Sequence, residues 1–155
     1  MAYSITDLCK GCSVCAKLCP VAAVSGIPNE KYTINPRRCV ECGVCGRACP
    51  KGAVTDAAGN PLPRVPRMDW PKPQFASGKC TACGICVQAC TAGALEIAQP
   101  QGRGNLHVSA YLAGEKKCVG CGLCAKECPM EAIEMQEASV SPGATTSKKQ
   151  EEVAA

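Results

Sequence analysis

The cysteines of this chain repeat one spacing, and that spacing is suited to binding iron–sulfur clusters. All sixteen cysteines among the 155 residues fall into four copies of C-x-x-C-x-x-C-x-x-x-C. These copies, called motifs 1 to 4, are Cys9, Cys12, Cys15, Cys19; Cys39, Cys42, Cys45, Cys49; Cys80, Cys83, Cys86, Cys90; and Cys118, Cys121, Cys124, Cys128. A [4Fe–4S] cluster takes four thiolates at such spacings. The motifs therefore predict four [4Fe–4S] clusters, with iron bound through these sixteen cysteines.

The residues between the cysteines are small where the backbone must approach a cluster. Glycine follows the second cysteine in motifs 2 to 4, at Gly43, Gly84 and Gly122, and Ser13 takes this place in motif 1. Glycine permits backbone angles and close approaches that a side chain would block. Three motifs end in Cys-Pro, and proline turns the chain without leaving an N–H group to satisfy. This pattern predicts a tight loop around each cluster, followed by a turn.

Disulfide bonds and zinc are the other common uses of clustered cysteine. Disulfide frameworks occur in secreted chains, and the N-terminus lacks the charged and apolar regions of a secretory signal. Zinc sites are usually built from two cysteine pairs well apart in sequence, not from an unbroken run of four. Cubane iron–sulfur clusters are therefore favoured over both alternatives.

The composition is that of a small protein held together by metal. Only five aromatic residues are present, namely Tyr3, Tyr32, Trp70, Phe75 and Tyr111. They are too few for a conventional large core, so we expect cluster binding to supply folding free energy. No apolar run approaches the roughly 20 residues that span a bilayer, so membrane insertion is not expected.

The formal net charge of +4 counts every cysteine as neutral. A cubane with four thiolates carries about −2, so four clusters bring the total to roughly −4, and to about −8 after each accepts one electron. The positive residues mainly offset cluster charge. Since no basic stripe with interleaved aromatic residues is present, nucleic-acid binding is not indicated.

The repeat extends beyond the cysteines. Each motif is followed by an alanine and an aliphatic residue: Ala23-Val24, Ala53-Val54, Ala94-Leu95 and Ala132-Ile133. The alternation at residues 3–5 and 32–34 suits short strands. Each unit is thus predicted to run as strand, cluster loop, one or two helical turns and a returning strand.

Three segments lie outside this repeat. Residues 59–73 hold five prolines and Trp70, which predicts a semi-rigid connector that packs on the chain or docks on a partner. Residues 99–115 predict an extended hairpin with a strand at Leu106–Leu112. The small, polar and charged residues of Ser139–Ala155 predict a mobile tail.

No set of residues has the pattern of a catalytic site. The single histidine, His107, lies in the predicted hairpin, and Asp7, Asp56 and Asp69 are scattered along the chain. The glycines at 102 and 104 lack the context of a phosphate-binding loop. With every cysteine assigned to a cluster, we expect a non-catalytic electron carrier.

The four motifs resemble those of bacterial dicluster ferredoxins, duplicated into a polyferredoxin. The resemblance implies an α+β fold of two tandem modules, with small β-hairpins and short helices around the clusters. The expected divisions are module 1 at 1–58, the connector at 59–73, module 2 at 74–138 and the tail at 139–155. It also implies crossed ligand sets: Cys9, Cys12, Cys15 and Cys49; Cys19, Cys39, Cys42 and Cys45; Cys80, Cys83, Cys86 and Cys128; and Cys90, Cys118, Cys121 and Cys124.

A second resemblance rests on KYTINP at 31–36, ECGVCGR at 41–47, PKGAV at 50–54 and RVPRMDWPKP at 64–73. Together these segments are similar to the small iron–sulfur subunit of tungsten-dependent aldehyde oxidoreductases. This resemblance implies a relay from a large tungstopterin subunit to ferredoxin or to a flavin subunit that reduces NAD. It also implies a cytoplasmic, anaerobic setting. Subunits of hydrogenases or formate dehydrogenases, a free polyferredoxin and a chain that self-associates end to end are the alternatives.

Thr91 stands where the other motifs have proline (Pro20, Pro50 and Pro129). It restores an N–H group and adds a hydroxyl beside Cys90. Hydrogen bonds toward cluster sulfur tend to raise the reduction potential. We therefore predict that Thr91→Pro lowers one potential and leaves all four clusters assembled.

Overall fold

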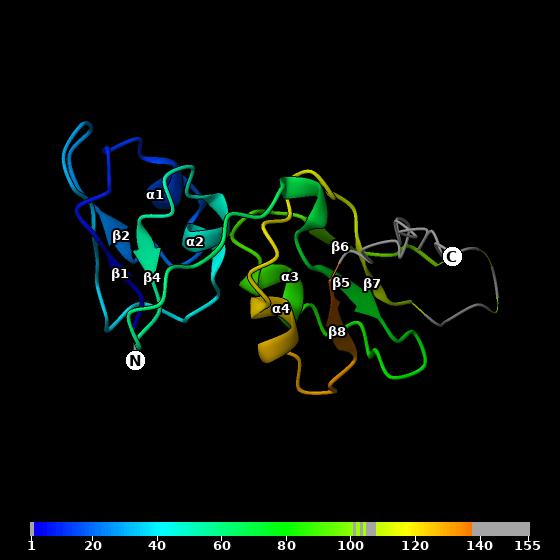
Figure 1. Cartoon of the computed structure of the whole chain (residues 1–155). Helices are drawn as coiled ribbons and strands as arrows, with labels where there is room; N and C mark the ends of the chain where they lie inside the picture. The colour runs from blue at the N-terminus through cyan, green and yellow to red at the C-terminus, as the bar shows by residue number, and fades with distance from the viewer. Residues whose placement is uncertain (1, 101, 103, 105–107, 138–155) are drawn as a thin grey trace, which may run out of the picture.

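The protein has two lobes joined by an extended connector, seen in a computed structural model (Figure 1). The structure describes residues 2–100, 102, 104 and 108–137. The first lobe contains β1 (Ser4–Ile5), α1 (Val14–Leu18), β2 (Val24–Ser25), β3 (Thr33–Ile34), α2 (Val44–Ala48) and β4 (Val54–Thr55). The connector forms a 3₁₀ turn, η1 (Arg67–Asp69). The second lobe contains β5 (Lys72–Phe75), α3 (Ile85–Ala89), β6 (Leu95–Ile97), β7 (Ala110–Leu112), α4 (Leu123–Lys126) and β8 (Ile133–Gln136).

Each lobe pairs its first strand with its last and its two middle strands with each other. In the first lobe, β1 pairs antiparallel with β4 and β2 with β3. In the second lobe, β5 pairs with β8 and β6 with β7. Helix α1 packs on α2, and α3 packs on α4. The predicted α+β class with short helices and small antiparallel hairpins is therefore confirmed.

The helices begin and end where the cysteine spacing requires. Each starts directly after the residue that follows the second cysteine, and that residue has a positive φ of 63° to 81° in every motif. The helices are four or five residues long. Helices this short are not stable alone in water. Their stability must come from the tertiary contacts of the cysteine loops that flank them.

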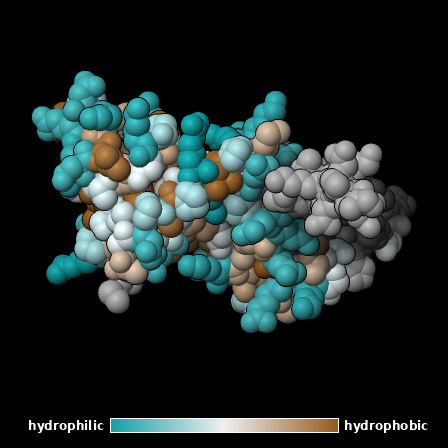
Figure 2. All heavy atoms as spheres, in the orientation of Figure 1, coloured by the Kyte–Doolittle hydropathy of each residue, from teal (hydrophilic) through white to brown (hydrophobic). Residues whose placement is uncertain are grey.

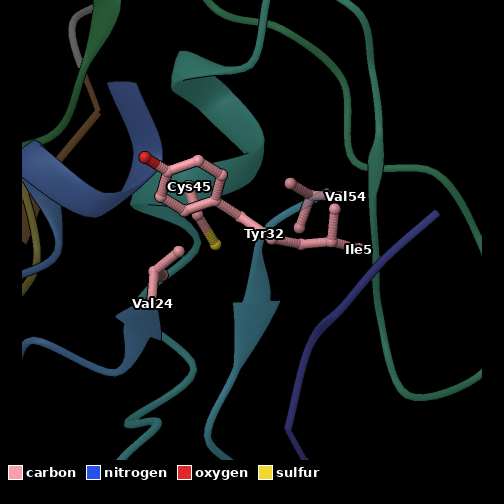
Figure 3. Packing of buried hydrophobic residues seen from close by; sticks show 5 residues of the cluster. All are labelled: Ile5, Val24, Tyr32, Cys45 and Val54. Atoms are coloured by element: carbon pink, nitrogen blue, oxygen red, sulfur yellow. The ribbon is translucent and has the colours of Figure 1, made fainter. Parts of the chain in front are cut away.

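The first lobe has a small apolar core built around a cysteine. Ile5, Val24, Tyr32, Cys45 and Val54 pack together, as Figure 3 shows. Ile5, Val24 and Val54 lie in β1, β2 and β4, Cys45 lies in α2, and Tyr32 directly precedes β3. The second lobe has a corresponding cluster of Cys86, Leu95, Ala110, Cys124 and Ile133. Cysteines are thus part of both cores.

The surface has no single broad apolar face in the view of Figure 2, where small hydrophobic patches alternate with hydrophilic side chains. The exposed large hydrophobic residues are spread over both lobes and the connector, and include Leu8, Ile27, Met68 and Met130. Within the described ranges, no helix is long and apolar enough to cross a bilayer.

The connector packs against the chain. Trp70 is only 3% exposed and its indole Nε1 donates to the carbonyl of Val65 at 3.0 Å. Strand β5 begins at Lys72, inside the segment predicted as connector, because its residues Lys72 and Pro73 pair with Gln136 and Met135.

The predicted strand at Leu106–Leu112 is too long. Val108 and Ser109 are not in a strand, and β7 begins at Ala110. Leu106 and His107 lie outside the described residues, as does the predicted tail.

Candidate iron–sulfur cluster sites

Four cavities between the loops and helices are each lined by four cysteines. Three cysteines in each cavity come from one motif, and the fourth is the last cysteine of its partner motif. We call them site 1 (Cys9, Cys12, Cys15, Cys49), site 2 (Cys19, Cys39, Cys42, Cys45), site 3 (Cys80, Cys83, Cys86, Cys128) and site 4 (Cys90, Cys118, Cys121, Cys124). These combinations are the same as the crossed sets expected from the sequence. None of the sixteen cysteines forms a disulfide bond.

Left-handed backbone on both sides of the second cysteine bends each loop around its cavity. The residue before this cysteine has a positive φ in all four motifs, at Gly11, Glu41, Ala82 and Gly120. Gly120 cannot be replaced without a shift, because a Cβ there would lie 2.5 Å from the carbonyl oxygen of Pro71. The loop of motif 4 therefore fits tightly against the connector.

Backbone N–H groups point at the sulfur of the last cysteine in every motif. The donors are the alanines four residues later, with N···Sγ distances of 3.2 Å (Ala23 to Cys19), 3.3 Å (Ala53 to Cys49), 3.4 Å (Ala94 to Cys90) and 3.4 Å (Ala132 to Cys128). A hydrogen bond from N–H favours the charged thiolate over the thiol.

The sequence pattern included these alanines but did not reveal their role. They are at most 2% exposed. A small side chain lets the chain pack closely enough for its own N–H group to reach the sulfur. The recurrence of alanine four residues after the last cysteine was the available signal.

The pKa of the third cysteine is raised by burial in every motif. Burial, with a smaller contribution from neighbouring thiols, raises the pKa of Cys15 to about 11 and those of Cys45 and Cys124 to about 12. Burial also raises the pKa of Cys86. Four thiolates in one such cavity require nearby positive charge, which the irons of a cluster supply. Four sulfur donors, N–H groups and apolar walls together fit a [4Fe–4S] cluster.

The group that covers each loop differs between the lobes. In the first lobe the hydroxyl of Tyr32 hydrogen-bonds Ser13 at 2.8 Å, and the hydroxyl of Tyr3 donates to the carbonyl of Glu41 at 3.0 Å. Burial raises the pKa of Tyr3, which keeps this hydroxyl protonated and able to donate. In the second lobe the corresponding groups are apolar. The Cδ1 atom of Ile97 faces Gly84, and Cγ of Met135 faces Gly122.

The acidic residues singled out in the sequence lie away from these cavities. Asp7 forms an exposed ion pair with Lys31 at 2.7 Å, and Asp56 accepts hydrogen bonds from the backbone of Ala58 and Asn60. Asp69 ends the 3₁₀ turn of the connector. Their roles in the described structure are local and structural.

Comparison with protein families identifies the repeated unit. Residues 8–53 and residues 74–135 each match a 4Fe-4S dicluster domain. This chain is built from 4Fe-4S dicluster domains. A further match to a 4Fe-4S dicluster domain, at residues 31–91, spans motifs 2 and 3 and overlaps both others. Because the repeat is regular, any two successive motifs can match the dicluster domain. The observed strand pairs join motif 1 with motif 2 and motif 3 with motif 4.

Among solved structures, the chain is similar to one in the formate dehydrogenase–heterodisulfide reductase–formylmethanofuran dehydrogenase complex from Methanospirillum hungatei. The identity is 19%, the TM-score is 0.42, and the match covers 90% of this chain and 54% of the other. The chain thus spans about half the length of the protein that it matches. No curated protein matches the sequence. The dicluster domains make this an iron–sulfur electron-transfer protein.

Proposed function

We propose that this chain relays single electrons through four [4Fe–4S] clusters, one at each of sites 1 to 4. The observation that carries the proposal is the set of four cavities, each lined by four cysteines from two motifs. The crossed combinations are the proposed ligand sets. Modules at 1–58 and 74–138 with a connector at 59–73 are the proposed divisions of the chain.

A bound cluster supplies reversible one-electron chemistry, and the chain determines where and at what potential it occurs. The cysteine thiolates hold the irons. The N–H groups of Ala23, Ala53, Ala94 and Ala132 stabilise negative charge on the sulfurs that they face. Apolar walls such as Val24 and Leu95 keep water from the cavity. The proposed role is non-catalytic, because substrate chemistry would occur on a partner.

The partner that we propose is a large tungstopterin aldehyde oxidoreductase subunit, with electrons passing on to ferredoxin or to a flavin subunit that reduces NAD. The support is the resemblance of residues 31–36, 41–47, 50–54 and 64–73 to the small subunit of such enzymes. In that role, aldehyde oxidation would release two electrons, which the chain would carry one at a time. A cytoplasmic location and anaerobic metabolism belong to the same proposal.

The test is to isolate the native protein without oxygen and to measure the metals and sulfide that co-purify. About sixteen irons per chain would support four clusters, and tungsten in the same complex would support the aldehyde oxidoreductase. Nickel or molybdenum would instead favour a hydrogenase or a formate dehydrogenase. Iron alone would favour a free polyferredoxin. Zinc with little iron would reject the electron-transfer function.

A further inference from the structure

A small apolar cluster joins the two lobes, and it contains cysteines from both. Trp70 packs with Val44 of α2 and with Val119 of motif 4, and all three are buried. Cys42 of site 2 and Cys121 of site 4 pack against the same cluster. We call this group of residues the junction. It brings a cysteine of site 2 and a cysteine of site 4 against one cluster that contains Trp70, although their motifs are not adjacent in sequence.

Two cations bridge the junction in opposite directions. Nη2 of Arg47 in α2 donates a hydrogen bond to the carbonyl of Cys42 in its own motif at 3.1 Å. It donates a second one to the carbonyl of Gly120 in motif 4 at 2.8 Å. In the opposite direction, Nζ of Lys126 in α4 donates a hydrogen bond to the carbonyl of Val40 in motif 2 at 3.3 Å. Arg47 and Lys126 each lie two residues after the third cysteine of their motif. Motifs 2 and 4 therefore face each other with approximate two-fold symmetry.

Arg47 contacts the tryptophan of the junction as well as both loops. Its guanidinium carbon is 5.8 Å from the centre of the Trp70 ring, within the range of a cation–π interaction. Its Nε atom is buried and has no hydrogen-bond partner within the described part of the chain. The side chain thus holds a positive charge between the loops of sites 2 and 4, where little water screens it.

The outer sites differ in their surroundings. The second cysteine is exposed in site 1 (Cys12) and in site 3 (Cys83), whereas Cys42 and Cys121 are partly covered. Sites 2 and 4 meet at the junction, and sites 1 and 3 are the other sites of the two lobes. The spatial order of the sites is therefore 1, 2, 4, 3, which differs from the order of the motifs in the sequence. Partners would reach the relay at its two exposed ends.

We propose that electrons cross between the lobes from site 2 to site 4 through the junction, and that Arg47 raises the reduction potentials of these two inner sites. In the crossing one cluster is oxidised by one electron and its neighbour is reduced by the same electron, with no bond made or broken. The reduced cluster carries one more negative charge, so a nearby guanidinium stabilises the reduced state. Arg47 is a positioning residue, and the proposal rests on the proposed four-cluster function.

The test compares Arg47→Gln with Lys17→Gln, which removes one charge from the equivalent exposed position of motif 1. Reduction of the anaerobic holoprotein is followed by EPR at controlled potentials. We expect Arg47→Gln to move two of the four reduction steps to lower potential. At a fixed potential near these steps, the ratio of reduced to oxidised clusters should fall several-fold, where tenfold corresponds to about 59 mV for one electron.

Arg47→Lys keeps the charge, so its reduction potentials should stay close to those of the unaltered protein. A purely structural role of Arg47 would not predict this result. The fluorescence of the single tryptophan, with acrylamide as quencher, shows whether the junction stays closed in each variant. Equal shifts in all four steps, an equal effect of Lys17→Gln, or unchanged potentials with a closed junction would overturn the proposal. An iron content far below about sixteen in the unaltered protein would instead refute the four-cluster function itself.

Discussion

The two lobes hold their cysteine loops in the same way but cover them with different side chains. Tyrosine hydroxyls reach the loops of Ser13 and Glu41 in the first lobe. In the second lobe the covering atoms belong to Ile97 and Met135. The strand pairs also differ, since those of the first lobe are two residues long and those of the second are three or four.

This difference distinguishes the residues that hold a cluster from the residues that cover its loop. The cysteines, the left-handed backbone positions beside them and the alanines recur in all four motifs, so we assign them to the holding of a cluster. The covering groups vary between lobes and are free to set each site's polarity. Because a reduced cluster carries more negative charge, a site with polar hydroxyls nearby should be easier to reduce than one covered by apolar atoms.

Removing iron should have the largest effect and should erase the difference between the lobes. Both cores contain cysteines, at Cys45 in the first lobe and at Cys86 and Cys124 in the second. Without metal, the cavities and the short helices lose their main support, so we expect both lobes to unfold. Circular dichroism after anaerobic chelation measures this, and iron plus sulfide should restore the signal. A chain that keeps its folded spectrum without iron would contradict the prediction.

Double cysteine variants in the first lobe come next, with the second lobe as internal reference. Cys9 and Cys49 line the same cavity although they belong to different motifs. Cys9→Ala with Cys49→Ala should therefore cost one cluster, about four irons, whereas Cys9→Ala with Cys19→Ala should cost two, about eight. Iron analysis decides between crossed and sequential ligation. Sequential ligation would produce the reverse result.

A smaller effect is expected from the tyrosine hydroxyls. Tyr3→Phe or Tyr32→Phe removes one hydrogen bond beside a cluster loop, worth about 1 kcal/mol. Each variant should lower a reduction potential of the first lobe and leave the second lobe unchanged. Tyr111→Phe is the control, because that exposed hydroxyl bonds to Glu96. If the control shifts the potentials as much, the covering groups do not explain the difference.

The smallest effect should come from Thr91, which lines the cavity of site 4 and is exposed. Thr91→Pro makes motif 3 like the other motifs and removes an N–H group and a hydroxyl. We expect one potential to fall slightly, with all clusters retained, in a redox titration followed by EPR. Unchanged potentials would show that Thr91 has no influence on its site.

Much of the fold could be predicted because it is encoded locally. The strands at Tyr3–Ile5 and Tyr32–Ile34 were found within one residue, as β1 and β3. The aliphatic residues Val24, Val54, Leu95 and Ile133 each begin a strand. The start of β7 was predicted too early, because the sequence of residues 106–112 resembles a strand along its whole length. The ligand sets and module boundaries remain predictions.

The sequence by itself determined the type of cofactor and the form of each loop, because cysteine spacing and left-handed backbone positions act within about a dozen residues. Only the tertiary structure decided which sites lie next to each other. A regular repeat makes several motif pairings equivalent, as the match at 31–91 shows. The arrangement of the lobes instead depends on contacts between distant segments, in which Trp70 packs with Val44 and Val119 and Arg47 donates a hydrogen bond to the carbonyl of Gly120. Such contacts depend on how side chains pack in space, and spacing along the chain does not reveal them.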